Sequence, residues 1–110
     1  MDVAVVACKD VVPDEVRDRA KAKVAKLGRM APVLEMAEVR LTEDHDRSGA
    51  RYACEVTLQG HGHHLRASAA AHELHAAVDL VVDKLEHQVE RMKGKLLDRS
   101  QARHQTQLLA

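Results

Sequence analysis

The sequence has 110 residues, 45% of them hydrophobic, and its 17 basic side chains are balanced by 17 acidic ones. This length suits one domain with a modest core, and the balanced charge excludes a strongly basic or strongly acidic protein. The sequence shows no basic leader followed by an apolar segment, and no apolar run long enough to cross a bilayer. We therefore expect a soluble, cytoplasmic protein without a membrane partner, whose affinity for any polyanion depends on how its charges are distributed.

The charges are distributed unevenly along the chain. Basic residues outnumber acidic ones by six to three between Asp14 and Arg29, and again by six to three between Lys84 and His104. Between Glu35 and Asp46 the balance reverses, with five acids and one basic residue, Arg40. Positive charge is thus concentrated in two segments, both of which have the periodicity of helices.

The first two predicted elements are a strand and a helix. Val3–Cys8 is a continuous, valine-rich apolar run, typical of an inner strand or of a strand covered on both faces. Pro13 suits the first turn of a helix that we expect from Asp14 to about Met30. The helical spacing places a basic row beside the buried side: the buried residues are Val16, Ala20, Val24 and Leu27, and the basic row is Arg19, Lys23 and Lys26.

Three further strands follow. Apolar and polar residues alternate from Ala37 to Thr42 and again from Tyr52 to Gln59, which predicts two half-buried strands. We expect the polar segment Glu43–Ala50 to form the loop between them. The residues Gly60-His61-Gly62 indicate a turn, and alternation resumes from His64 to Ser68 in a third strand, which completes an antiparallel meander.

The longest periodic segment, from about Ala71 to Leu97, predicts a helix whose side chains are sorted into three stripes. The core stripe is apolar, with spacings of three and four residues, and contains Leu74, Val78, Val81, Leu85, Val89, Met92 and Leu96. Roughly 100° around the helix lies a basic stripe of Lys84, Gln88, Arg91 and Lys95, with His87 at its margin. The acidic stripe contains Asp79, Asp83, Glu86 and Glu90. Exposed helices usually mix their charges, whereas this one sorts them, which fits a binding surface and a merely solvated face equally well.

The element order β-α-β-β-β-α predicts an α+β sandwich, in which a four-stranded sheet carries two helices packed on one face. We place this domain at residues 1–98. From Arg99 onward the sequence is polar and lacks a period, so residues 99–110 are expected to be a polar tail or the start of a linker.

The histidines form two groups that suggest metal ligation at first sight. His61, His63 and His64 cluster at the predicted turn, and His72 and His75 are three positions apart. Neither group has the spacing of a zinc hydrolase motif. We expect exposed histidines and no bound metal.

Catalytic signals are weak as well. Cys8 and Cys54 are too few and too far apart for a metal knuckle or a disulfide framework, and a free cysteine in a strand is most often a small buried apolar residue. No nucleophile is paired with a base at a recognisable spacing, and no glycine-rich phosphate loop is present. We expect no catalytic residue, no cofactor and no small-molecule substrate, and conclude that the protein is not an enzyme.

The two helical segments resemble those of a known family. The segment Glu73–Lys95, ELHAAVDLVVDKLEHQVERMKGK, is similar to the last helix of the ribosome hibernation-promoting factor family, also called ribosome-associated inhibitor or protein Y. Val12–Met30, VPDEVRDRAKAKVAKLGRM, resembles the first helix of that family, and the predicted strand order matches too. The resemblance covers roughly residues 1–97 and corresponds to the N-terminal ribosome-binding domain of the family.

The resemblance implies a domain that binds rRNA in the decoding region of the small ribosomal subunit. There it would exclude mRNA and tRNA, inhibit translation and stabilise idle ribosomes under stress, with small-subunit rRNA and the whole ribosome as partners. Carried over from the family's motifs, the RNA-binding residues are Lys23, Lys26, Arg29, Lys84, Gln88, Arg91 and Lys95, with His87 where arginine is usual and Arg66 as an extension. We expect the basic ridges of both helices to form one cationic surface that recognises phosphates by shape and charge.

This chain departs from the family in ways that leave alternatives open. Tyr52 is its only aromatic residue, so phosphate contact rather than base stacking must carry RNA binding. Imidazole gains charge in mildly acidic solution, so His87 would then tighten RNA binding. Longer family members add a domain that pairs two ribosomes, so we expect a short form or part of a longer, self-associating one. The alternative function is a protein-association module that dimerises through the long helix or a sheet edge without binding RNA directly.

Overall fold

The computed structural model describes residues 1–7, 12–47 and 49–109, and all side chains discussed below precede residue 96. Along the chain the elements are β1 (Asp2–Ala7), α1 (Asp14–Met30), β2 (Met36–Asp46), β3 (Gly49–Gly60), β4 (His63–Ala71) and α2 (Leu74–Leu109). The predicted order β-α-β-β-β-α and the α+β class are confirmed.

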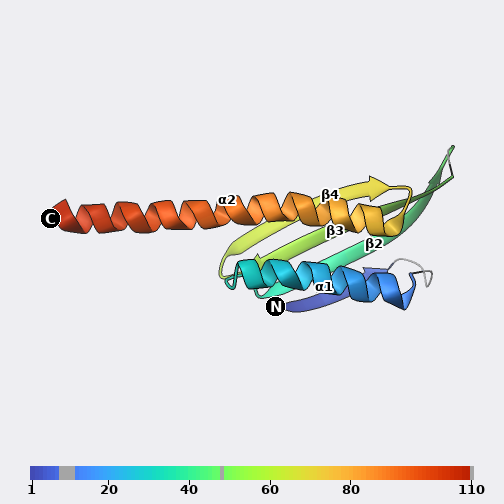
Figure 1. The fold of residues 1–110 in the computed structure, drawn as a ribbon, viewed down its shortest axis with the longest axis horizontal. Helices are drawn as coiled ribbons and strands as arrows, with labels where there is room; N and C mark the ends of the chain where they lie inside the picture. The colour runs from blue at the N-terminus through green and yellow to red at the C-terminus, as the bar shows by residue number, and fades with distance from the viewer. Residues whose placement is uncertain (8–11, 48, 110) are drawn as a thin grey trace.

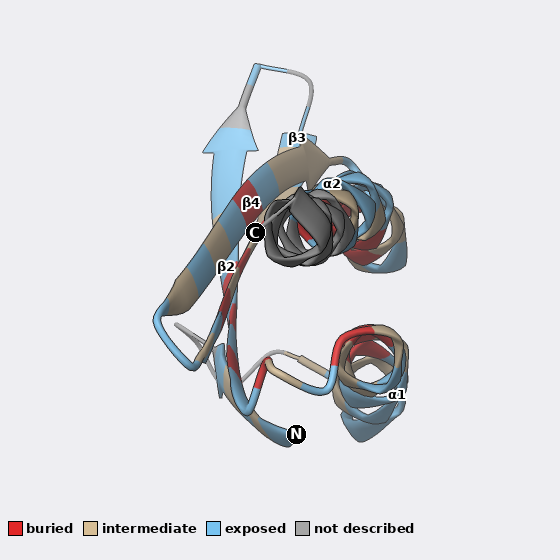
Figure 2. Cartoon of the chain, turned by 90° about the vertical axis from the view of Figure 1, so that its left-hand side faces the viewer, coloured by how far each residue is buried: buried red, intermediate tan, exposed pale blue. Residues whose placement is uncertain are grey.

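The strands form one four-stranded sheet in the order β1-β2-β3-β4 (Figure 1). β1 and β2 are parallel, whereas the β2–β3 and β3–β4 pairs are antiparallel, as the predicted meander requires. Both helices lie on the same side of the sheet, side by side (Figure 2). The predicted arrangement of two helices on one face is therefore confirmed.

β1 lies at an edge of the sheet, so the prediction of an inner or doubly covered strand for Val3–Cys8 is wrong. Val6 is 46% exposed, whereas Val3 and Val5 pack, partly buried, against the core. The chain returns through α1 to a parallel β2 and then adds β3 and β4 on the far side of β2, which leaves β1 with a single neighbour. Cys8 lies outside the described residues.

The core fills the space between the sheet and the helices (Figure 2). Alternate residues of the central strands, such as Val39, Val56 and Leu58, point toward the helices and are fully buried. Cys54 belongs to this layer, as predicted, and desolvation by burial raises the pKa of its thiol to about 11. From α1 come Ala20, Val24 and Leu27, whereas Val16 is only partly buried.

The core stripe of α2 sets the rotation of that helix about its axis. Val78, Val81, Leu85, Val89 and Met92 are buried, and Leu74 packs partly buried at the helix start. Each fully buried Leu or Val side chain stabilises the fold by roughly 1.5–3 kcal/mol. With this stripe held on the sheet, the other two stripes must occupy the opposite flanks of α2. The side chain of Leu96 lies outside those described.

The expected loop Glu43–Ala50 is largely strand, and that prediction is wrong. The β2–β3 ladder continues through the pairs of Glu43 with Tyr52 and Asp44 with Arg51, as far as Asp46 with Gly49. This part of the hairpin lacks the apolar alternation that reveals a half-buried strand, because it extends beyond the helices (Figure 1). Its acidic side chains made it look like a loop, although main-chain pairing needs no apolar residues.

α2 continues to Leu109, whereas the sequence predicted a polar tail or linker from residue 99. After Gly94 the segment contains no glycine or proline and is rich in Leu, Arg, Gln and Ala, which are good helix formers. Backbone propensity therefore extends the helix beyond the point where the core stripe has a sheet to cover. The end of the domain at residue 98 stays a prediction.

Candidate nucleic-acid interface

Two residues of the basic stripe bind the outer edge of β4. The Lys84 ammonium donates a hydrogen bond to the main-chain oxygen of Ser68 at 2.8 Å, and the Gln88 amide donates one to that of Arg66 at 3.0 Å. Four helical residues span about 6 Å and two strand residues about 6.6 Å, so the donors and acceptors match in spacing. These bonds satisfy main-chain groups that an edge strand otherwise leaves open. Lys84 and Gln88 therefore have a structural role in addition to any contact with RNA.

Beyond Gln88 the basic stripe borders a pocket. The pocket has a volume of about 490 Å³ and is lined by Gly62, His63, His64, Leu65, Gln88, Arg91, Met92 and Lys95. Arg91 and Lys95 are exposed, and neither has an ion-pair partner among the described residues. Of the predicted RNA-binding residues, Gln88, Arg91 and Lys95 are thus brought together around one cavity.

The basic row of α1 instead faces the acidic stripe of α2. Lys23 forms an ion pair with Asp79, and a groove of about 330 Å³ between the helices is lined by Lys23, Lys26, Asp79, Val82, Asp83 and Glu86. The prediction of one continuous cationic surface is wrong, because these acids lie between the basic row of α1 and the basic stripe of α2. Their position follows from the rotation of α2, which turns one flank toward β4 and the other toward α1.

The Lys23–Asp79 pair predicts a pH effect on stability. The hydrogen bond from Lys23, followed by the charges of Lys23, Arg19 and His75, lowers the pKa of Asp79 below its ordinary 3.8. Since the folded state lowers the pKa, the stabilisation is fully present above pH 3.8 and is lost as the pH falls through the lowered value. Both side chains are substantially exposed, 33% and 43%, so the contribution stays below about 1 kcal/mol.

We expect Asp79→Asn to lower the free energy of unfolding by this small amount at neutral pH, and by progressively less in acid, where the wild-type carboxylate also becomes neutral. Urea unfolding of both proteins at several pH values measures the difference. Asp18→Asn serves as the control, because Asp18 is exposed, lies beyond the first turn of α1 and has no ion pair among the described residues. A difference between wild type and Asp79→Asn that does not change with pH would contradict the assignment.

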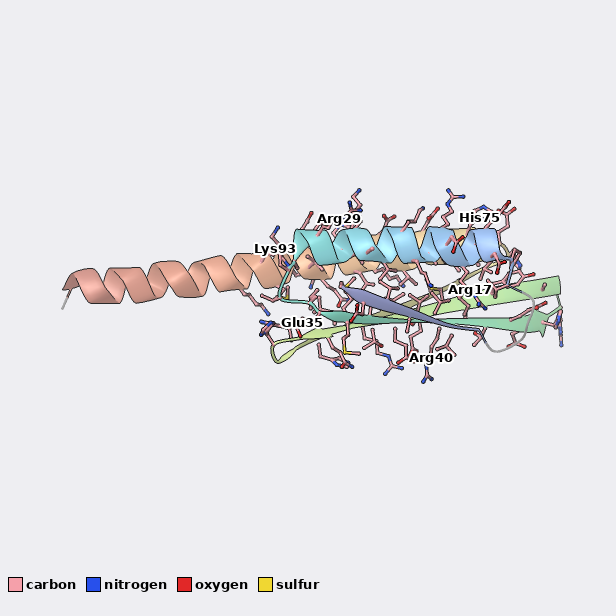
Figure 3. All side chains as sticks on the ribbon, turned by 90° about the horizontal axis from the view of Figure 1, so that it is seen from below. Arg17, Arg29, Glu35, Arg40, His75 and Lys93 are labelled. Carbon is pink, nitrogen blue, oxygen red and sulfur yellow. The ribbon has the colours of Figure 1, made fainter. Side chains whose placement is uncertain are left out.

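The other predicted RNA-binding residues lie apart from the pocket. The Arg66 side chain pairs with Glu55 at 2.8 Å on the face of the sheet opposite the helices, the face from which Arg40 also extends (Figure 3). Arg29 is exposed on α1, on its side away from the sheet (Figure 3). His87 is exposed, and its Nδ1 lies 2.8 Å from the main-chain oxygen of Asp83, so that nitrogen carries a proton and donates it.

His63 and His64 line the pocket although the sequence did not assign them to RNA binding. His61 and Gly62 have φ angles of 47° and 79°, as in the two-residue type I′ turn that joins adjacent strands. β4 therefore begins directly at His63, beside α2. The signal in the sequence was the short turn, but which helix residues lie opposite it depends on tertiary packing.

The histidines do not form a metal site within the described part of the chain. No group of three or more His, Cys, Asp or Glu side chains there is placed to hold a metal ion. Three of the described histidines have carboxylate neighbours instead: His61 with Glu35 at 2.8 Å, His75 with Glu73 at 2.9 Å and His45 with Glu43 at 3.6 Å. Over the same residues, neither helix combines the length and the apolar composition that a membrane span requires.

Comparison with known proteins identifies relatives over most of the chain. The profile of the family described as Sigma 54 modulation protein / S30EA ribosomal protein matches residues 8–97. A ribosome hibernation promoting factor of Azotobacter vinelandii is 30% identical over 90 residues, which cover 82% of this chain and 80% of that protein. The resemblance carried by the two helical segments is thereby confirmed.

Solved structures agree with this relationship. The N-terminal domain of Protein Y from Thermus thermophilus is 29% identical with a TM-score of 0.68, over 84% of this chain and 99% of that domain. A ribosomal subunit interface protein from Coxiella burnetii, 17% identical, shares the fold with a TM-score of 0.72, over 86% and 99% of the two chains. The profile match, the curated relative and the shared fold together show that this chain belongs to the Sigma 54 modulation protein / S30EA ribosomal protein family of ribosome-associated factors.

Proposed function

We propose that this protein is a cytoplasmic ribosome hibernation factor that binds rRNA in the decoding region of the small ribosomal subunit. Bound there, it occupies the space of mRNA and tRNA, inhibits translation and protects idle ribosomes. It acts by steric exclusion and needs no catalysis, cofactor or metal. The observation that carries the proposal is the pair of exposed cations Arg91 and Lys95, which share one pocket and have no ion-pair partner among the described residues, in a chain whose formal charges balance.

The chemistry of the surface favours phosphate as the recognised group. Arginine and lysine bind phosphate oxygens through charge-assisted hydrogen bonds, and contacts of this kind read the shape of a folded RNA rather than its base sequence. Tyr52, the only aromatic residue, is partly buried on β3 and far along the sheet from the β3–β4 turn. Base stacking therefore contributes little to this interface.

The alternative of a dimerising module has less surface to use. The core-stripe residues of α2 that the structure describes as buried, Val78, Val81, Leu85, Val89 and Met92, lie inside the domain and cannot pair two copies. The β4 edge is covered by Lys84 and Gln88 at two positions. Large exposed apolar side chains occur singly on different elements, as with Val6 on β1, Met36 on β2 and Leu80 on α2.

Binding to small subunits should depend strongly on salt. If the interface neutralises about four phosphates, the logarithm of affinity falls with the logarithm of salt concentration at a slope near −3, so a fourfold increase in salt weakens binding by about 60-fold. Co-sedimentation of the labelled protein with purified small subunits at several salt concentrations measures this slope. Affinity that is constant over the range, or absence of binding at the lowest salt, would refute the proposed function.

A further inference from the structure

The β4 edge presents main-chain groups outward at every second residue. The carbonyls of Arg66 and Ser68 point away from β3, since both accept hydrogen bonds from α2. In an antiparallel pair this direction alternates along the strand, so His64 must also turn its N–H and C=O outward. The register agrees, because His64 pairs with Gln59, whose carbonyl accepts from the Glu35 N–H on the β2 side of β3.

The covering of this edge stops at His64. Lys84 donates a hydrogen bond to the main-chain oxygen of Ser68, and Gln88 donates one to that of Arg66. No described residue of α2 donates to or accepts from the main chain of His64. At that position the 490 Å³ pocket opens, and the next two members of the basic stripe, Arg91 and Lys95, line it. The His64 side chain is exposed and, by the alternation of β4, extends from the face away from the helices. The part of His64 that borders the pocket is therefore its main chain.

We propose that this pocket binds one phosphate group, held by the Arg91 guanidinium, the Lys95 ammonium and the main-chain N–H of His64. The two side chains carry two positive charges, more than the single negative charge of one phosphodiester, so they attract a phosphate group strongly. The outward N–H of His64 adds a hydrogen-bond donor whose direction is fixed by the β3–β4 ladder. Gln88, whose amide already donates to Arg66, closes the end of the pocket. The source of the phosphate is the RNA backbone, and this part of the inference rests on the proposed function.

The main-chain donor can be removed without disturbing the sheet. Because the His64 N–H points away from β3, His64→Pro deletes it and leaves the β3–β4 ladder bonds in place, as proline at edge strands does. His64→Ala removes the imidazole and keeps the N–H. Titration of each full-length variant with inorganic phosphate, against chloride at equal ionic strength, is followed by amide NMR.

The wild type and His64→Ala should bind phosphate alike, with the largest shifts at Leu65, Arg91 and Lys95, whereas His64→Pro should bind at least about fivefold more weakly. Arg91→Gln should weaken phosphate binding to the same extent without any change to the strand. This variant therefore tests the site if His64→Pro does not fold. Shifts spread evenly over all surface lysines, or equal affinity in Arg91→Gln and wild type, would overturn the site.

Small-subunit binding separates this inference from the proposed function. Arg91→Gln should weaken binding to small subunits about tenfold, while Lys21→Gln, which removes one exposed charge from the far side of α1, should leave it within about twofold. If both variants weaken binding equally, the pocket is wrong and the proposed function stands. If the wild type binds phosphate at the pocket but no small subunit, the pocket stands as a phosphate site and the proposed function fails.

Discussion

Reversing both charges at the pocket, in the double variant Arg91→Glu with Lys95→Glu, is expected to lower affinity for small ribosomal subunits by at least about 100-fold. Each substitution removes a charge-assisted hydrogen bond to phosphate, which contributes about 1.5–3 kcal/mol, and places a carboxylate against the RNA backbone. Both side chains are exposed and unpaired among the described residues, so the fold should be unaffected. Co-sedimentation at low salt gives the affinity, and thermal unfolding confirms that the domain is intact.

The control must change the net charge equally at another place. Lys21→Glu with Arg47→Glu does so, because Lys21 is exposed on α1 and Arg47 is exposed at the tip of the β2–β3 hairpin. This pair should weaken binding by less than about fivefold, through long-range repulsion alone. Equal losses in the two double variants would show that only total charge matters. Lys84 is left out of the test, because its bond to Ser68 would confuse loss of contact with loss of structure.

The elements and the core were predictable because each depends on a local period. Helical spacing identified the core stripe of α2, and alternation identified the helix-facing residues of β2 and β3, since burial on one face selects apolar residues at fixed intervals. The tip of the β2–β3 hairpin could not be predicted in this way. Glu43–Asp46 extends beyond the helices, so no burial selects apolar residues at alternate positions there. The position of β1 at the sheet edge depends on the order of the strands, and the local sequence of β1 carries no signal for it.

The candidate site was predictable in its residues but not in its arrangement. The sequence showed that basic and acidic residues occupy different flanks of α2, yet which flank faces α1 is decided by how the helix packs on the sheet. Lys23 and Lys26 consequently face Asp79 and Glu86, and the predicted common surface divides in two. The pocket at His64 depends on the register of α2 against β4, which no single segment encodes.

Gly60→Ala is expected to destabilise the domain by at least about 3 kcal/mol, a large part of the roughly 5–15 kcal/mol that a domain of this size has. Gly60 looks like a turn glycine, but the positive φ angles belong to His61 and Gly62. Its requirement is space: an added Cβ would lie 2.0 Å from the Val33 oxygen and 2.6 Å from the Glu35 nitrogen. These are main-chain atoms, and that nitrogen also donates to Gln59 at 2.8 Å, so neither neighbour yields easily.

Two other glycines provide matched controls for the same substitution. Gly94→Ala places its Cβ in open space on α2 and should stabilise the protein by about 0.5–1 kcal/mol through helix propensity. Gly62→Ala also meets no atom, but its φ of 79° should cost about 1–2 kcal/mol. Thermal and urea unfolding of the three variants should therefore rank Gly94→Ala above wild type, Gly62→Ala below it and Gly60→Ala lowest. If Gly60→Ala destabilised the protein no more than Gly62→Ala, the segment from Val33 to Glu35 would not pack on the end of β3 as described. The end of β3, which leads into the β3–β4 turn and the proposed phosphate pocket, would then lack the support of that segment.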